Sequence, residues 1–312
     1  MKVEEQHFET IEAYIEESPG WELDVLQLSP GQLDFSSTLV VLSGVQLAWD
    51  HNGAKMEQHT SYQASGIAFG MALKSDSRAL FRGHELDFGD ALLWQSGEEF
   101  EYIVPKGLSS LIVRVDEALV ELLGWCVAGS SMQRVPRRHL LKLQLSCHQA
   151  TLAARELADI PGDSSQQDAL LWRDRILTDL EAVLQPWLDE TAYLKKGALL
   201  ATPHFQLIKK TEHLFARYDL EKPLEVDTLA RSLGVSPRTL YHAFRESLGV
   251  GPYGYFQLIR LHKLRDILLA SSPSEANVIS LASDLGFNQA GRLSVAYRKH
   301  FGESPSETLK RN

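Results

Sequence analysis

Hydrophobic and polar positions divide the chain into stretches with different periods. Near the start, residues 7–17 (HFETIEAYIEE) have the spacing of a short amphipathic helix. From Trp21 to about Val115, short runs rich in β-branched and aromatic residues, such as STLVVLSGVQLAW, GIAFGMAL and SSLIVRV, are separated by Gly, Pro, Asn and Asp. Many short strands with such turns predict a small antiparallel barrel or sandwich.

The period changes to that of helices after this region. Residues 138–160 have helical spacing and end at Pro161-Gly162-Asp163. In the next segment Leu170, Leu177 and Leu184 recur every seven residues. Such a stripe suits either the seam of a dimer or an internal helix of a bundle.

Residues 226–244 predict a sharp break between two helices. Gly234 ends the first helix because glycine adopts a positive φ at little cost. Ser236 is a good N-cap for the second helix, and Pro237 suits its first position. The pattern predicts two helices joined at a steep angle by a turn of about three residues.

This helix pair occurs twice, with a long helix between the copies. The long helix is expected at residues 252–272, and about 20 helical residues span roughly 30 Å. That length is close to one turn of B-DNA, about 34 Å. The helix can therefore hold two recognition helices in successive major grooves. Positions that recur 52 residues later are Val226, Leu229, Ala230, Leu233 and Gly234, which correspond to Val278, Leu281, Ala282, Leu285 and Gly286.

Charge and cysteine content agree with a DNA-binding module joined to an acidic body. Residues 201–312 hold 15 basic and 11 acidic residues, a formal charge of +4, whereas residues 1–200 carry −14. Cys126 and Cys147 are too few for a disulfide framework, which predicts a reducing, cytoplasmic location. No apolar run approaches the roughly 20 residues needed to span a bilayer, so no membrane partner is expected.

Residues 203–312 resemble the DNA-binding domain of the AraC/XylS family of transcriptional regulators. The stretch SLASDLGFNQAGRLSVAYRKHFGESPSE follows the family pattern I-A-x-x-x-G-F … F-x-x-x-F-+-x-x-x-G-x-S-P. The chain departs from it with Leu293 and Tyr297 at the two Phe positions, and with Thr308 where an aromatic residue often follows Ser-Pro. These changes have the character of core substitutions of similar shape.

The predicted first recognition helix faces inward with Leu240, Ala243 and Phe244 and outward with polar groups. The resemblance places base-reading positions at Arg238, Tyr241 and His242, and Arg238 can pair bidentately with a guanine edge. On the second recognition helix the family's reading positions hold Ala290, Gly291 and Val295, while Arg292 and Arg298-Lys299 suit phosphate contacts. The full set of expected DNA contacts is Ser236, Arg238, Thr239, Tyr241, His242, Arg245, Asn288, Gln289, Gly291, Arg292, Val295 and Arg298.

Residues 81–107 (FRGHELDFGDALLWQSGEEFEYIVPKG) resemble part of the cupin-like barrel at the N-terminus of many AraC-type regulators, where an effector binds. A metal-dependent cupin enzyme needs a close His pair, a carboxylate and a further His. His51, His59 and His84 form no H-x-H pair, and Phe100 stands where the later ligand is expected. No metal, cofactor or catalytic residue is therefore predicted. Interior candidates for a sensory pocket are Trp49, Phe69, Trp94 and Phe100.

These observations predict an α+β protein with an N-terminal cupin-like β-barrel and flanking helices, followed by an all-α domain with two helix-turn-helix motifs joined by a long helix. The expected domains are a cupin-like effector-binding domain at 1–125, a helical linker or dimerisation segment at 126–200 and an AraC-type DNA-binding domain at 201–312. The expected function is sequence-specific transcription regulation, by family habit activation, in response to a small organic effector. The alternatives are a ligand-independent regulator controlled by abundance or a partner protein, a cupin-type enzyme with an appended DNA-binding domain, and, for the first domain, a scaffold that binds no ligand. Expected partners are double-stranded DNA, the effector, RNA polymerase by family analogy and a second copy in a homodimer.

Overall fold

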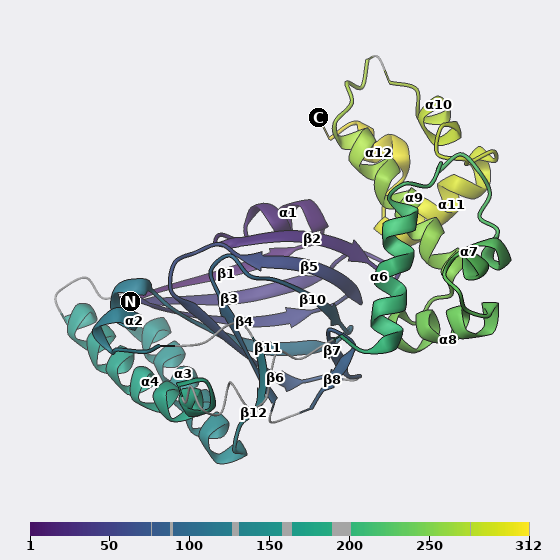
Figure 1. Cartoon of the computed structure of the whole chain (residues 1–312). Coiled ribbons are helices and arrows are strands. Elements are labelled where there is room, and N and C mark those ends of the chain that lie inside the picture. The colour runs from purple at the N-terminus through teal and green to yellow at the C-terminus, as the bar shows by residue number, and fades with distance from the viewer. Residues whose placement is uncertain are drawn as a thin grey trace.

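The computed structural model of the chain describes residues 1–75, 77–87, 90–126, 131–157, 164–188, 201–274 and 276–311. Figure 1 shows a sheet-rich part built from the first half of the chain, with helices α3 (Arg137–Leu157) and α4 (Ser164–Leu188) lying against it. The last third of the chain forms a separate group of helices at the other end of the sheets. The α+β class is therefore confirmed. The turn expected at Pro161-Gly162-Asp163 lies outside the described residues, as does the end of the expected segment 126–200.

The strands form two open antiparallel sheets. A seven-stranded sheet has the order β1-β3-β4-β11-β6-β9-β12, and a five-stranded sheet has the order β2-β5-β10-β7-β8. In the described part of the chain neither sheet closes on itself, so the predicted closed barrel is wrong. Turn residues and alternation indicate antiparallel strands, but they do not reveal whether the outermost strands pair with each other. The strands are β1 (Lys2–Phe8), β2 (Trp21–Gln27), β3 (Phe35–Leu42), β4 (Val45–Asn52), β5 (Met56–Tyr62), β6 (Ile67–Lys74), β7 (Ala79–Phe81), β8 (His84–Leu86), β9 (Asp90–Gln95), β10 (Glu99–Val104), β11 (Leu108–Val115) and β12 (Ser131–Arg134).

The first residues form a strand before they form a helix. Helix α1 (Ile11–Glu16) is shorter than predicted, because His7 and Phe8 belong to β1. The hydroxyl of Thr10 accepts a hydrogen bond from the backbone N–H of Ala13 at 3.3 Å and so caps α1. Helix α2 (Glu117–Leu122) is capped in the same way by Asp116.

The seven-stranded sheet buries one face beneath α3 and α4. Side chains along a strand point alternately to the two faces, so Phe69 packs on Trp187 of α4 with ring centroids 6.2 Å apart. The heptad residues Leu177 and Leu184 are buried in this same core. Of the two alternatives for the stripe, the structure supports an internal helix rather than a dimer seam.

The last third of the chain folds around two small cores joined by one helix. Tyr255 and Phe256 belong to the core of α6 to α8, and Leu261, Leu264 and Leu268 belong to that of α10 to α12. All five come from α9, whose first half therefore packs in the first core and whose second half packs in the second. The helices are α6 (Pro203–Phe215), α7 (Val226–Ser232), α8 (Pro237–Leu248), α9 (Pro252–Leu269), α10 (Val278–Ser283), α11 (Ala290–Phe301) and α12 (Pro305–Leu309).

A buried arginine links these helices to the sheet part. Arg265 of α9 has a side chain only 3% exposed. Its guanidinium donates to Glu12 of α1 over 2.6 and 3.0 Å and to Glu303 over 2.6 Å. The same group lies 4.7 Å from the ring centre of Phe301. Arg265 therefore holds α1, α9 and the end of α11 together.

A second link lies between β5, α6 and α9. The ammonium of Lys209 lies 2.5 Å from Glu212 and also contacts His59. The hydroxyl of Tyr255 lies 2.6 Å from Glu57 and 3.1 Å from Glu212, and its one proton serves one of them at a time. Burial, together with the nearby Glu212 charge, raises the pKa of Glu57 well above its usual range. Burial alone would raise the pKa of Glu212, but hydrogen bonding from His59 and the Lys209 charge bring it to about 2.

Two histidines, His262 half-buried and His300 buried, form a third link. His262 of α9 and His300 of α11 bring their Nε2 atoms within 3.3 Å, and His262 Nε2 also lies 3.3 Å from the carbonyl of Gln27. Burial lowers the pKa of His262 to about 3 and that of His300 to about 4. Both rings are therefore neutral near pH 7, and one donates where the other accepts.

Among the described residues, no helix is both long and apolar enough to cross a lipid bilayer.

Candidate nucleic-acid interface

The first helix pair has the local geometry that its sequence predicts. Gly234 follows α7 with φ of +70°. Ser236 caps α8 by accepting a hydrogen bond from the backbone N–H of Thr239 at 3.1 Å. Pro237 occupies the first turn of α8, where a missing N–H leaves no bond unmade.

Helix α8 presents one apolar and one polar face. Leu240, Ala243 and Phe244 are fully buried in the core that α6 shares with α8. All of the predicted contact residues of this motif lie on the exposed side: Ser236, Arg238, Thr239, Tyr241, His242 and Arg245. The structure thus brings these six side chains together on one solvent-facing surface, which we call the α8 face.

The side chains of the α8 face differ in the contacts that they already make within the protein. Within the described ranges, Arg238 and Arg245 have no hydrogen-bond or ion-pair partner. The Thr239 hydroxyl lies 2.8 Å from that of Ser236. The Tyr241 ring lies against Gly251, where an added Cβ would come within 3.0 Å of it. The two arginines are therefore the side chains most able to reach a new partner.

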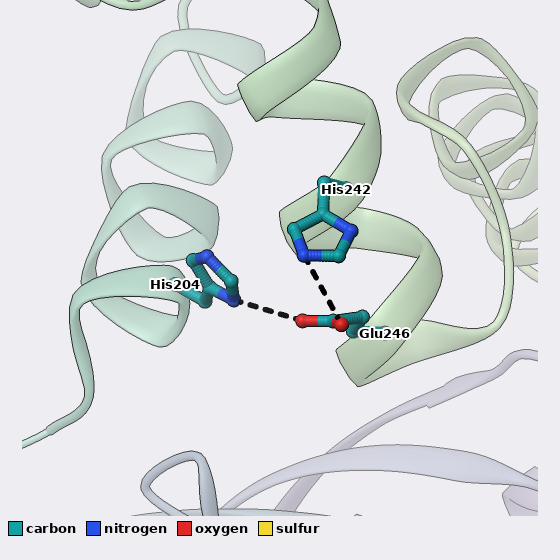
Figure 2. A group of neighbouring side chains, drawn as sticks. All are labelled: His204, His242 and Glu246. Atoms are coloured by element: carbon teal, nitrogen blue, oxygen red, sulfur yellow. Dashed lines mark ion pairs between the residues drawn. The ribbon is translucent and has the colours of Figure 1, made fainter.

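His242 has neighbours that the sequence did not reveal. Its Nε2 lies 3.1 Å from Glu246 Oε1, one helical turn further along α8. The other carboxylate oxygen of Glu246 lies 3.2 Å from Nδ1 of His204, at the start of α6. Figure 2 shows the three side chains converging between the two helices. His204 is far from His242 in sequence, so no local pattern could have identified this cluster.

The second helix pair repeats the first, but its second helix, α11, lacks the side-chain cap that α8 has. Asn277 caps α10 by accepting hydrogen bonds from the N–H groups of Ile279 and Ser280. Gly286 has φ of +76°, and a Cβ there would lie 2.8 Å from the guanidinium of Arg260, so only glycine fits. Gln289 precedes α11 but makes no side-chain capping bond.

Helix α11 exposes small groups and arginines. Val295 is 70% exposed, and nothing lies within 4 Å of where a Cβ on Gly291 would stand. Arg298 donates to Glu307 at 3.1 Å, so part of its charge is already neutralised. All of the predicted contact residues of this motif are exposed: Asn288, Gln289, Gly291, Arg292, Val295 and Arg298.

The departures from the family pattern lie in the core of the second motif and compensate one another. Leu293 and Tyr297 are buried, as is Thr308. The Tyr297 hydroxyl donates to Thr308 Oγ1 at 2.9 Å, and Thr308 in turn donates to Glu303 at 3.0 Å. Tyr297 stands where the family pattern has phenylalanine, and Thr308 where it often has an aromatic residue. The extra hydroxyl of Tyr297 therefore donates its hydrogen bond to the hydroxyl that Thr308 brings.

Helix α9 is slightly shorter than predicted, and its buried side includes two arginine side chains. Its 18 residues span about 27 Å at the usual rise of about 1.5 Å per residue. Ile259 and Ile267 are only half-buried, whereas Arg260 and Arg265 are buried. Arg260 donates to the carbonyl of Lys222, in the connection between α6 and α7, at 2.6 Å and also approaches Gly286.

The four predicted pocket residues lie in two different places. Trp94 and Phe100 line a cavity of about 250 Å³ between the sheets, with ring centroids 5.4 Å apart. Trp49 instead donates from Nε1 to Thr151 of α3, and Phe69 packs on α4. Both faces of β6 and β9 are apolar, so for Phe69 and Trp94 hydrophobicity alone did not indicate which face of the strand lines the cavity.

Polar groups line the same cavity. The carboxyl of Asp50 and the guanidinium of Arg114 both face it. Burial raises the pKa of Asp50 to about 6, although a hydrogen bond to Ser37 and the charge of Arg114 act in the opposite direction. Gln58 donates to the Tyr14 hydroxyl at 3.3 Å on another wall. An apolar cavity with a few convergent polar groups has the form of a small-molecule site.

A family model described as a helix-turn-helix domain matches residues 229–311. The "XylDLEGF operon transcriptional activator 2" of Pseudomonas putida is 30% identical over 115 residues, which are 37% of this chain and 71% of that protein. The "Probable thc operon regulatory protein" of Rhodococcus erythropolis is 40% identical over 90 residues.

The family model lies within the last third of the chain. The match to the Rhodococcus protein covers 29% of this chain and 27% of that protein's length. Among solved structures, the AraC-like transcriptional activator CuxR aligns with 90% of this chain and 100% of its own, at 14% identity and a TM-score of 0.43. The relatives named here are transcriptional regulators, which agrees with the prediction that the chain is not a cupin-type enzyme.

Proposed function

Because this chain belongs to the AraC/XylS family of transcriptional regulators, we propose that it binds specific DNA sequences through the α8 face and α11 and activates transcription. The observation that carries this proposal is the pair of exposed helix faces joined by α9. Twelve predicted contact residues all lie on exposed positions of these two motifs. A rise of about 27 Å along α9 comes near the roughly 34 Å between successive major grooves.

The two motifs are proposed to divide the work of recognition. The α8 face offers Arg238, which can read guanine bidentately, whereas α11 offers small groups and Arg292. Sequence information should therefore reside mainly in the half-site that α8 contacts. Arg292 and Arg245 are assigned to phosphates, which fix position without reading bases.

Arg238→Ala is expected to weaken binding by about 1–3 kcal/mol and to relax preference at one or two base pairs. Arg292→Ala is expected to weaken binding almost equally on all sequences and to lower the salt slope by about one. Selection from randomised DNA, followed by titration at several salt concentrations, measures both. If Arg292→Ala relaxes base preference while Arg238→Ala weakens binding uniformly, the assignment is reversed.

We further propose that the cavity between the sheets binds a small organic effector. Its walls are aromatic, with Trp21, Trp94 and Phe100, and its polar groups include Asp50 and Arg114. A volume of about 250 Å³ suits a molecule with one ring and a hydrogen-bonding or charged end. In this proposal residues 1–125 sense the effector, 126–200 link and 201–312 bind DNA.

A screen of small aromatic and aliphatic molecules, with and without carboxylate or amine groups, tests the cavity by thermal unfolding. A ligand present at 100 times its Kd is expected to stabilise the protein by about 2.7 kcal/mol. Trp94→Leu should weaken that ligand at least about tenfold, since its indole lines the cavity. Trp49→Leu is the matched control and should leave ligand affinity unchanged, because Trp49 faces α3.

Equal weakening by the two tryptophan variants would place the ligand elsewhere. A screen without any stabilising molecule would favour the alternative of a ligand-independent regulator controlled by abundance or a partner protein.

RNA polymerase and a second copy of the chain remain proposed partners. Since the α4 stripe is internal, a second copy would have to use another surface. Leu141, Leu145 and Leu152 of α3 are 51%, 54% and 44% exposed. Their spacing places them along one side of the helix, which is the surface we assign to a homodimer contact.

A further inference from the structure

Three side chains with metal-ligating atoms converge beside α8, outside the cavity and outside the buried links. His242 and Glu246 stand four residues apart on α8, so both project from the same side of that helix. His204 reaches them from the first turn of α6 (Figure 2). The ligand atoms of all three lie within 4.8 Å of one another.

The two helices are held in register by the core beneath this cluster. Phe205 and Ile208 of α6 are completely buried with Leu240 and Phe244 of α8. The backbones that carry His204, His242 and Glu246 are therefore fixed by packing, and only side-chain torsions remain free to adjust. A site with preset backbones loses less conformational entropy when it binds a ligand.

We propose that His204, His242 and Glu246 form a binding site for a divalent transition-metal ion of the Zn²⁺ type. Two imidazole nitrogens and one carboxylate oxygen are a donor set that zinc accepts, at about 2.0–2.2 Å from each donor. Donors around a tetrahedral ion at these lengths lie about 3.3–3.5 Å apart. His204 Nδ1 lies 3.2 Å from one oxygen of Glu246 and His242 Nε2 lies 3.1 Å from the other. Because one ligand atom from each residue lies within 4.8 Å of the others, rotation of the side chains can direct all three donors to one ion.

The chemistry of the donors selects the class of ion. Imidazole favours zinc, nickel, cobalt and copper, whereas Mg²⁺ and Ca²⁺ prefer sites made of oxygen alone. The side chains of His204, His242 and Glu246 are 40%, 58% and 53% exposed. The ion would therefore enter directly from solvent and keep water in its remaining position.

A second cluster with metal-ligating atoms differs in one decisive respect. Glu57, His59 and Glu212 also lie within ligand distance of one another. Lys209 inserts its ammonium among them, 2.5 Å from Glu212 and 3.9 Å from Glu57. That cluster already contains its cation, whereas in the described part of the chain the carboxylate of Glu246 pairs with the two imidazoles alone.

The proposed ion would bind at the recognition helix itself. It would be coordinated by Nε2 of His242, a residue of the α8 face, and would link the start of α6 to α8. The site is separate from the proposed function in one practical sense, because metal binding can be measured without DNA and DNA binding can be measured with a chelator present.

Titration of the metal-free full-length chain with Zn²⁺, followed by calorimetry, tests the proposal. One equivalent is expected to bind to the wild type, with affinity at least about tenfold lower in His204→Ala and Glu246→Ala. His213→Ala is the matched control, since this exposed histidine lies on the same helix outside the cluster. Circular dichroism of each variant establishes that the fold is retained.

Co²⁺ supplies a spectroscopic reading of the same site. Its visible absorption should show nitrogen and oxygen coordination in the wild type and in His213→Ala, and should be lost in His204→Ala. Excess Mg²⁺ should not displace it. Absence of stoichiometric binding, or equal affinity in the wild type and His204→Ala, would overturn the proposal. The cluster would then be only a carboxylate, Glu246, that contacts two histidines.

Discussion

Insertion of two alanines between Arg260 and Leu261 is expected to lower the affinity for a full operator by about 10²–10⁴-fold, the gain that simultaneous engagement of two sites provides. Two extra helical residues rotate the second motif by about 200° and move it by about 3 Å. The insertion point separates Tyr255 and Phe256, which pack with the first motif, from the residues that pack with the second. Each half of α9 keeps its own core.

The matched control is the same insertion between Ser272 and Pro273, in the exposed connection that follows α9. It lengthens a loop without changing the path of α9 and should leave affinity within a few-fold of the wild type. Footprint length and affinity together measure the result. An α9 insertion that binds with unchanged affinity and footprint would show that the motifs do not act as one rigid reader.

Arg265→Ala is expected to lower the free energy of unfolding by about 3–5 kcal/mol, the usual cost of removing one partner from a buried ion pair. The substitution leaves the carboxylates of Glu12 and Glu303 without the cation between them, and it removes the contact with the Phe301 ring. Urea denaturation of the full chain measures the effect.

Arg311→Ala provides the comparison for that experiment. Arg311 pairs with the same Glu303 at 2.7 Å, but its side chain is 43% exposed. Surface ion pairs contribute roughly 0–1 kcal/mol, so this variant should unfold close to the wild type. Similar losses in the two variants would mean that burial of Arg265 adds nothing to its pairing.

Local signals were sufficient to predict the exposed and buried sides of α8. Ser236, Pro237 and Gly234 set the position of the helix, and once its start is known, the period of 3.6 residues assigns each side chain to a face. The same logic worked for α11. The predicted helix at 7–17 was partly wrong because the edge strand β1 begins before it, and such pairing depends on a distant strand.

The errors in the sheets arise from information that alternation does not contain. Phe69 and Trp94 come from strands that are apolar on both faces. Alternation of polar and apolar residues therefore does not show which face of these strands lines the cavity. Whether two sheets close into a barrel likewise depends on contacts between strands far apart in the chain. Trp94 and Phe100 line the cavity, whereas Trp49 contacts α3 and Phe69 packs on α4.

Contacts between distant segments were beyond reach of the sequence. Arg265 reads as a solvated residue on an amphipathic helix, yet its partner Glu12 is on α1. His204 lies before the first helix pair and has no local signal, yet it faces Glu246. Both partnerships follow from how α6, α8 and α9 pack, which no short pattern records.

The empty space around Gly291 has a consequence for how this protein can acquire new targets. Since nothing lies within 4 Å of a Cβ at that position, a longer side chain there meets no steric obstacle. Its backbone has no positive φ to oppose the change, and most residues form helix better than glycine. If α11 contacts bases as proposed, a single substitution at Gly291 is expected to give it a new base preference while the fold and α8 are retained. Retargeting of this proposed half-site, in evolution or by design, would then need no stabilising mutation first.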